Sequence, residues 1–138
     1  MIYKKSKLIK SILRDKDKRG SIVSIVNHQS SNVSIITCNK GSIRSNHYHY
    51  EDYHFMYVIE GGIDYFFRDK TTGGFEYLRV TENQTIFTPC LEWHATYFPV
   101  FTRLIVSSKN PRDKETYEND TVREILLSPE TLEDFKSK

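Results

Sequence analysis

Four of the five histidines in this 138-residue chain are spaced so that they can act together. His47 and His49 are two residues apart in a β-prone run, so their side chains point to the same face of a strand. After a short connection the chain can reverse, which places His54 at the start of the next strand beside them. His94 begins a late β-prone run, and in a closed barrel a late strand can lie beside an early one. For His28, which lies in a polar turn, we expect a structural role.

Converging imidazoles favour a bound ligand over four separate structural histidines. Each neutral ring offers one nitrogen lone pair, and imidazole is the most common metal ligand at neutral pH. Rings packed side by side would repel one another if they were protonated. A shared cation or a shared anionic ligand is the simpler explanation, and the pattern favours the cation.

The stretch from Gly41 to Gly61, GSIRSNHYHYEDYHFMYVIEG, resembles the first sequence motif of the cupin superfamily. That motif has a glycine, a His-x-His pair, usually a glutamate, and a second glycine; here His54 takes the glutamate position. The stretch NQTIFTPCLEWHATYF resembles the second motif and keeps its proline and histidine, Pro89 and His94. The positions where that motif usually has Gly, Gly and Asn are taken by Asn83, Leu91 and Phe98.

The resemblance implies an all-β, single-domain cupin, a double-sheet jelly-roll barrel with its ligands inside. The domain would span residues 1–138, with a barrel core at about 20–107 and a C-terminal extension at 108–138 that ends in a short helix. The implied metal ligands are His47, His49, His54 and His94. Without the usual carboxylate this set is neutral, which favours one divalent transition ion (Zn, Fe, Ni or Cu) over Mn or Mg.

Two shorter fragments narrow the function that the resemblance implies. Residues 17–20, DKRG, followed by a strand, resemble the opening of cupins that act on nucleotide-linked sugars. Residues 43–49, IRSNHYH, resemble part of the keto-deoxyhexose epimerases and of capsular-sugar epimerase domains. The implied reaction is epimerisation or isomerisation of a nucleotide-linked keto sugar, by proton removal next to a carbonyl.

The resemblance also implies roles for individual residues. Either His47 is the base, as in metal-free epimerases, or a metal polarises the carbonyl and another group moves the proton. By position, Tyr57, Tyr65 and Tyr97 are further candidates for moving the proton. Arg44 matches an arginine that contacts substrate in the epimerases, and the rings of Tyr65 and Trp93 can stack on a sugar or base. Two other functions stay open: an iron-dependent dioxygenase of a small organic substrate, and a non-catalytic cupin that binds a carbohydrate or another small molecule.

The elements that must position these residues are mostly strands. β-Prone runs with turn residues between them occupy 21–26, 32–37, 43–50, 54–59, 63–68, 75–80, 85–88, 95–98 and 103–107. Gly61-Gly62 and Gly73-Gly74 predict hairpin connections. Ser128-Pro129-Glu130 predicts the start of a C-terminal helix, and residues 3–14 read as a short amphipathic helical segment.

Composition limits the partners. The first 19 residues carry eight of the 20 Lys and Arg residues, but the rest of the chain is net acidic, so we expect no nucleic-acid partner. The longest apolar run, Phe55 to Ile59, is too short to cross a bilayer, so we expect no membrane partner either. No secretory leader is evident, which predicts a cytoplasmic protein. Exposed β-rich ends predict a homodimer.

Overall fold

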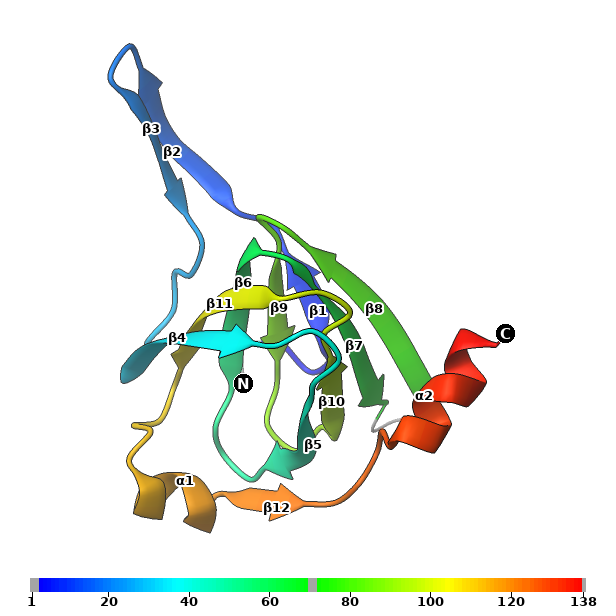
Figure 1. The fold of residues 1–138 in the computed structure, drawn as a ribbon. Helices are drawn as coiled ribbons and strands as arrows, with labels where there is room; N and C mark the ends of the chain where they lie inside the picture. Colours follow the sequence, from blue (N-terminus) through cyan, green and yellow to red (C-terminus); the bar gives the residue numbers. More distant parts are fainter. Residues whose placement is uncertain (1–2, 70–71, 138) are drawn as a thin grey trace.

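The computed structural model describes residues 3–69 and 72–137, and its main feature is a barrel of two five-stranded antiparallel sheets (Figure 1). In spatial order the first sheet contains β1 (Lys7–Ile9), β9 (Thr85–Thr88), β6 (His54–Glu60), β11 (Thr102–Ser108) and β4 (Asn32–Cys38). The second sheet contains β12 (Thr121–Arg123), β5 (Ile43–His49), β10 (His94–Tyr97), β7 (Gly62–Arg68) and β8 (Phe75–Thr81). This is the all-β jelly-roll barrel that the cupin resemblance implies.

The barrel interior is built by strand alternation. On β6, for example, Met56 and Val58 are buried inside the barrel while Tyr57 between them is on the other face. The buried interior cluster consists of Cys38, Met56, Val58, Ile63, Tyr65, Phe67, Val80, Ile86, Phe98, Leu104 and Val106. Burial of each large apolar side chain in this cluster contributes about 1.5–3 kcal/mol, so the interior is the main source of stability.

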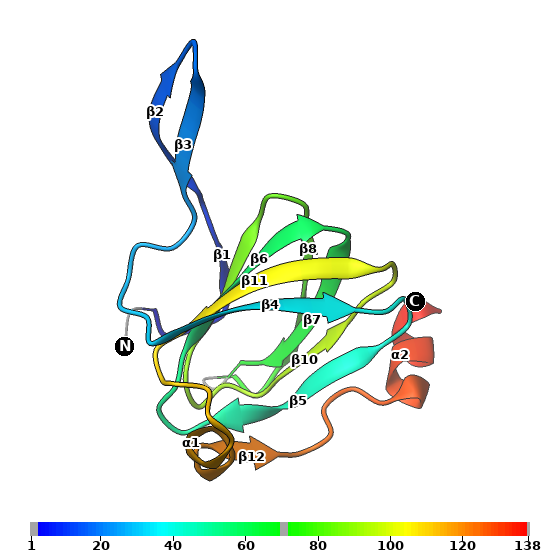
Figure 2. The ribbon, with the colours of Figure 1, turned by 60° about the vertical axis from the view of Figure 1, so that its left-hand side comes forward.

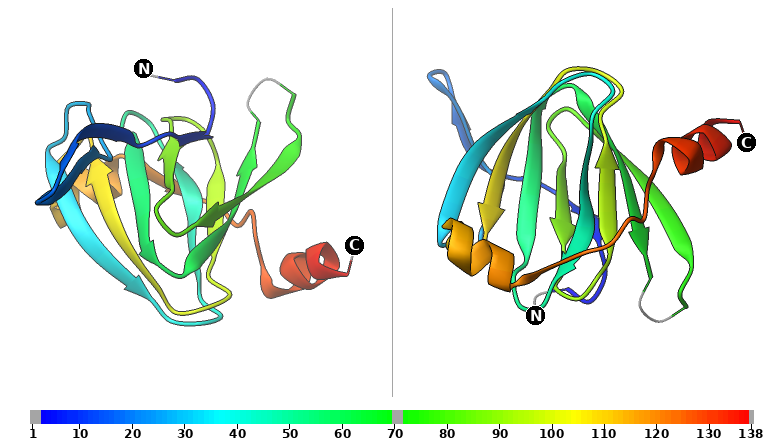
Figure 3. Two further views of the ribbon diagram at one scale, coloured as in Figure 1. Left: turned by 90° about the horizontal axis from the view of Figure 1, so that it is seen from above. Right: turned by 60° about the horizontal axis from the view of Figure 1, so that its bottom comes forward.

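A second apolar cluster covers the outer face of the second sheet. Phe66 and Ala95 pack there against Leu126, Leu127 and Leu132 of the C-terminal segment. That segment contains α1 (Lys114–Asn119), β12 and α2 (Pro129–Lys136), and the views from above and below show it wrapping along one side of the barrel (Figure 3). α2 begins as predicted, because Ser128 caps it by accepting a hydrogen bond from the backbone N–H of Thr131.

The hairpin of β2 (Ile12–Asp17) and β3 (Gly20–Ser24) projects away from the barrel (Figure 2). The helical expectation for residues 3–14 was therefore wrong, since this segment contains β1 and the first half of β2. Pairing of β1 with β9 and of β2 with β3 decides its conformation. In such a short segment, tertiary strand pairing overrides a weak helical pattern.

The turns between strands mostly follow the predictions. Gly61 connects β6 to β7 with a φ of 91°, and a Cβ atom there would collide with the carbonyl oxygen of Phe101. Gly73 and Gly74 close the β7–β8 hairpin through hydrogen bonds with Asp69. Within the part of the chain that the structure describes, no helix is long and apolar enough to span a membrane.

Candidate active site

The His-x-His pair lies on β5 beside a break in the regular strand. Ser45 and Asn46 have positive φ angles of 71° and 57°. In the pairing of β5 with β10, His94 is opposite His47 and Ala95 is opposite Ser45, which leaves Asn46 as an extra residue. This β-bulge changes the direction of the strand directly before the histidines.

Asn46 fastens the bulge to the C-terminal segment. Its side-chain oxygen accepts hydrogen bonds from the backbone N–H groups of Leu126 (2.9 Å) and Leu127 (2.8 Å). Its side-chain nitrogen donates to the carbonyl of Leu127 at 3.0 Å. The asparagine before the first histidine therefore holds the site in place and does not point into it.

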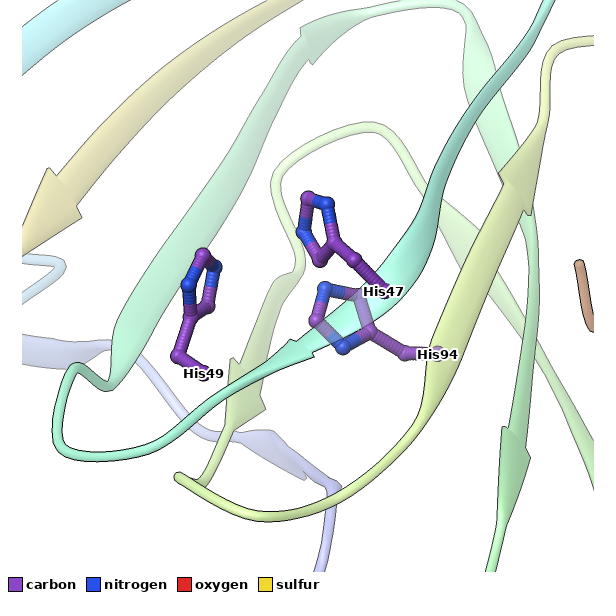
Figure 4. A group of neighbouring side chains, drawn as sticks. All are labelled: His47, His49 and His94. Carbon is purple, nitrogen blue, oxygen red and sulfur yellow. The ribbon is translucent and has the colours of Figure 1, made fainter. Parts of the chain in front are cut away.

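Three imidazoles converge inside the barrel, where His47 and His49 on β5 and His94 on β10 turn their rings toward one another (Figure 4). The ring centroid of His47 lies 4.6 Å from that of His49 and 4.8 Å from that of His94. One nitrogen from each ring lies within 4.8 Å of the others, and all three side chains are buried. We call these three residues the histidine trio.

His54, at the start of β6, lies beside the trio without joining it. Its ring centroid is 5.3 Å from that of His94 and 6.1 Å from that of His49. It is buried, and its Nδ1 has no hydrogen-bond partner among the residues that the structure describes. The close group of potential metal ligands thus contains three of the four histidines expected from the sequence.

Hydrogen bonds orient two of the trio's rings. Nδ1 of His94 lies 3.1 Å from the carbonyl oxygen of Glu92, so it is the protonated nitrogen that donates. Nδ1 of His49 lies 3.2 Å from Thr121 Oγ1, whose own hydroxyl donates to the carbonyl of Tyr117. In both rings Nε2 is then left with its lone pair, and it is buried with no partner in the described part of the chain. His47 likewise has an unpartnered buried nitrogen, Nδ1.

Burial keeps these rings neutral. Removal from water is the largest of the effects that lower the pKa of His47 to about 2, and the neighbouring His94 and His49 contribute to the same shift. Burial also lowers the pKa of His49 to about 4 and that of His94 to about 3. The pKa of His54 falls well below its ordinary value for the same reason. Neutral imidazoles with free lone pairs can bind a metal ion or accept a proton.

A cavity of about 130 Å³ lies between the histidines and the apolar interior. His47 and His54 line one part of it, together with Tyr117, and Arg44 and Arg112 also reach it. The ring of Tyr117 lies 5.5 Å from that of His49 and 6.2 Å from that of His47, measured between centroids. A larger cavity of about 700 Å³ lies between β1, the base of the projecting hairpin and Phe55, and none of the trio lines it.

Arg112 and Tyr117 are site residues that the sequence did not reveal. They follow the last predicted strand, where the sequence shows no motif, and α1 and β12 bring them back to the barrel. β12 pairs with β5, so Arg123 is opposite His47 and Thr121 is opposite His49. Only this long-range pairing identifies the segment as part of the site.

Tyr65 packs against the trio from within the barrel. Its ring stacks on that of His94, with an interplanar angle of 11° and centroids 6.2 Å apart. Its hydroxyl is 2.7 Å from Ser6 Oγ and 2.6 Å from Thr88 Oγ1, and Ser6 Oγ in turn donates to the buried carboxylate of Glu92. Tyr65 therefore supports His94 and, as placed, does not offer its hydroxyl to the cavity.

The structure places three other predicted residues away from the histidines. Tyr57 is on the outer face of its sheet and donates to Asn83 Oδ1 at 2.8 Å. Tyr97 and Trp93 belong to the outer cluster beneath α2 and the C-terminal segment. Strand alternation explains these positions, since each lies an odd number of residues from an inward-facing histidine. Arg44, by contrast, does line the cavity, although it is largely exposed.

The histidine trio fits a divalent transition metal. One nitrogen of each ring lies within 4.8 Å of those of the other two, and each ring has a buried nitrogen without a partner among the described residues. Two of the rings are oriented by hydrogen bonds from their other nitrogen, as is usual for metal-binding histidines. Three nitrogen ligands would leave coordination positions for a substrate oxygen. The donor set suits Zn, Fe, Ni or Cu.

A family model for the polysaccharide biosynthesis C-terminal domain matches residues 15–98. No curated protein sequence matches the chain at a significant level. The residues matched by the family model include the tip of the β2–β3 hairpin, the His-x-His pair and His94.

Solved structures resemble this chain closely in fold but not in sequence. A 3,4-ketoisomerase from Helicobacter canadensis superposes with a TM-score of 0.70 and 16% identity, over 86% of this chain and 90% of that one. The second structure is a mutant of the 3,4-ketoisomerase QdtA from Thermoanaerobacterium thermosaccharolyticum in complex with TDP-4-keto-6-deoxyglucose. It superposes with a TM-score of 0.67 and 19% identity over 89% of each chain. The capsular polysaccharide assembling protein CapF from Staphylococcus aureus superposes with a TM-score of 0.63 and 17% identity. The superposition covers 86% of this chain but only 32% of the CapF chain. At these identities the likeness establishes the shared fold.

Proposed function

This chain belongs to the polysaccharide biosynthesis C-terminal domain family, and from that premise we propose that it isomerises or epimerises a keto sugar linked to a nucleotide. The observation that carries the proposal is the histidine trio, a group of buried neutral imidazoles beside a small cavity. Sugar 3,4-ketoisomerases among the compared structures share the fold, and one is bound to TDP-4-keto-6-deoxyglucose. A TDP-linked 4-keto sugar is accordingly the substrate class to test first.

The proposed reaction needs a base and a group that stabilises negative charge. Removal of a proton from the carbon next to the ketone moves the C–H electron pair into a C=C bond and the carbonyl pair onto oxygen, which gives an enediolate. Return of the proton to the former carbonyl carbon, with transfer of the neighbouring hydroxyl proton to the former carbonyl oxygen, moves the ketone to the neighbouring carbon. Return to the original carbon from the other side inverts that centre. A neutral imidazole held at the cavity wall, such as His47, can accept and return this proton.

The trio can serve this reaction in two ways, and the metal content of the purified protein decides between them. A metal held by His47, His49 and His94 would polarise the ketone oxygen as a Lewis acid. A histidine whose lone pair binds a metal cannot accept a proton, so His54, which lies outside the trio, would then be the nearest imidazole base. Without a metal, His47 and His49 are the candidate bases.

Deuterium exchange tests the function. We expect the wild-type protein in D₂O to convert TDP-4-keto-6-deoxyglucose to an isomer with one deuterium on a ring carbon, detected by NMR and mass spectrometry. His47→Asn or His49→Asn should lower the rate at least about 100-fold, because general-base catalysis contributes about 10²–10⁴-fold. Tyr57→Phe, outside the barrel, is the matched control and should keep the wild-type rate. No deuterium incorporation across a panel of nucleotide-linked 4-keto sugars would count against the proposal.

We also propose a homodimer in the cytoplasm. The projecting hairpin exposes Ile12, Leu13, Ile22 and Val23, which are 48–57% exposed. β4 is the edge strand of its sheet and exposes Val33 (66%) and Ile35 (70%). An isolated hairpin is marginally stable and an open apolar edge invites pairing, so a second copy is the expected cover. A nucleotide-linked sugar substrate and the free buried thiol of Cys38 support the cytoplasm.

Light scattering coupled to size-exclusion chromatography tests the dimer. We expect the wild-type protein to have twice the chain mass of 16.3 kDa. Ile35→Lys should shift it toward the monomer, because a charge would be buried at the contact. Ile125→Lys, at a 75% exposed position in the C-terminal segment, is the control and should remain dimeric. A monomeric wild type at 100 μM, a concentration of the order used for such assays, would contradict the proposal.

A further inference from the structure

The loop between β11 and α1 places an arginine against the histidine cavity. Arg112 lines this cavity together with His47, His54 and Tyr117. Arg44 is the second cation there, and no carboxylate is among the described residues that line it. A cavity with two permanent positive charges and no acid is suited to a ligand that carries negative charge.

Two neighbours hold the Arg112 guanidinium in place. Its Nη2 lies 3.1 Å from Asp52 Oδ2, and the Asp52 side chain is only 3% exposed. The other Asp52 oxygen accepts a hydrogen bond from the backbone N–H of Asn110 at 2.9 Å, which fixes the carboxylate. The guanidinium carbon also lies 4.9 Å from the centre of the Tyr117 ring. The charge is therefore positioned before any ligand arrives, which is the requirement for electrostatic stabilisation of a transition state.

Part of the guanidinium's hydrogen-bonding capacity is unused. Nε and Nη2 are buried and make no hydrogen bond within the described residues, since the Nη2 contact with Asp52 has the distance of an ion pair but not hydrogen-bond geometry. A guanidinium carries five N–H donors, and burying such a donor without an acceptor is unfavourable. Nη2 still has the Asp52 carboxylate as its ion-pair partner. Nε is left for an acceptor that the described residues do not supply.

We propose that Arg112 donates hydrogen bonds to the sugar oxygen that becomes negatively charged during the reaction, an inference that rests on the proposed isomerase function. When the base takes the proton from carbon, the carbonyl electron pair moves onto this oxygen and the guanidinium offsets its charge. When the proton returns to the original carbon, the pair returns to the C=O bond; when it returns to the former carbonyl carbon, this oxygen takes the proton of the neighbouring hydroxyl, which becomes the new C=O. Arg112 acts only as a hydrogen-bond donor in these steps and transfers no proton. It lies outside residues 15–98, which the family model matches.

Steady-state kinetics with deuterium incorporation test this role. Arg112→Gln should lower kcat at least about 100-fold with KM changed less than about threefold, the pattern for a donor that acts mainly in the transition state. Arg112→Lys, which keeps the charge, should recover at least about tenfold of this loss. Arg123→Gln is the matched control and should keep kcat within about threefold. Arg123 lies 5.9 Å from the same Tyr117 ring but is 54% exposed and paired with Glu118.

Two results would overturn the proposal: a wild-type kcat in Arg112→Gln, or an equal loss in Arg123→Gln. Thermal melting establishes that each variant is folded at the assay temperature. If Arg112→Gln is not folded, Arg112→Lys decides, and a kcat equal to that of the wild type would then refute the role.

Calorimetric titration with oxalate, a planar dianion that resembles an enediolate, separates this proposal from the function itself. We expect wild-type protein to bind oxalate at least about tenfold more tightly than Arg112→Gln. If wild-type protein binds oxalate through Arg112 but leaves every keto sugar unchanged, the proposed function fails and the anion site stands. If it isomerises the sugar and Arg112→Gln does so equally well, the function stands and the role of Arg112 fails. Equal oxalate binding by both proteins also contradicts the anion site.

Discussion

Lowering the pH should destabilise the folded protein through its buried histidines. His47, His49 and His94 have pKa values of about 2, 4 and 3 in the folded state, against about 6.5 in the unfolded chain. Below pH 6.5 the unfolded chain therefore binds protons that the folded protein does not, and stability falls as the pH falls. The stabilising contribution of each neutral ring is fully present above pH 6.5, and its loss ends only near the folded pKa.

The expected effect is large. At pH 5, each of the three histidines lowers the free energy of unfolding by about 2 kcal/mol, from 1.36 kcal/mol for each of about 1.5 pH units. Together they remove about 6 kcal/mol, which is comparable with the whole stability of a typical domain, about 5–15 kcal/mol. The protein without metal should thus be close to unfolding at pH 5 while it is stable at pH 7.

Urea unfolding of chelator-treated protein at pH 7, 6 and 5, followed by the fluorescence of Trp93, measures this dependence. His94→Asn should reduce the pH slope by about one quarter, because it removes one of the four buried histidines whose pKa is lowered, His47, His49, His54 and His94. The control is His28→Asn, since His28 is exposed and its variant should keep the wild-type slope. A change of less than about 1 kcal/mol between pH 7 and pH 5 would refute the burial of neutral imidazoles on which the site is built.

Substitutions at three further positions test the framework around the site. Asn46→Ala should lower the free energy of unfolding by about 2–4 kcal/mol in urea titrations. The reason is that it removes three hydrogen bonds and leaves the buried backbone N–H of Leu127 unpaired. Asn46→Asp, which keeps the acceptor oxygen, should lower this free energy by less. Gly61→Ala should cost at least about 2 kcal/mol by the same measurement, because its Cβ would collide with Phe101 and its φ is positive. Tyr97→Phe should leave kcat within about threefold, because this side chain lies outside the barrel; a loss similar to that of the histidine variants would contradict its placement.

Local patterns in the sequence were sufficient for the strands, the turns and the inward-facing histidines. Alternation along β5 and β6 predicts that His47, His49 and His54 share the interior, and the Gly61 turn follows from a residue type that tolerates positive φ. Strand faces and turns depend on neighbours within a few residues, so they can be predicted from the local order of residue types. The cupin resemblance added the fold, and the N-cap at Ser128 predicted α2.

The same local rules failed where long-range pairing decides the structure. Residues 3–14 form strands because β1 pairs with β9, about 80 residues away. Leu91 adopts the left-handed backbone (φ 62°) that a glycine would take more easily, and its N–H donates to the carbonyl of His49 at 2.6 Å. This hydrogen bond to a distant strand accompanies a left-handed backbone conformation that leucine disfavours.

By itself, then, the sequence determined which residues could do chemistry and which strand faces they occupy. Only the tertiary structure decided how they are grouped. It brought His94 against His47 and His49, left His54 beside them, and added Arg112 from a segment without a motif. The physical reason is that direction along a strand is set by the period of the backbone, whereas distances across the barrel depend on the register of every paired strand.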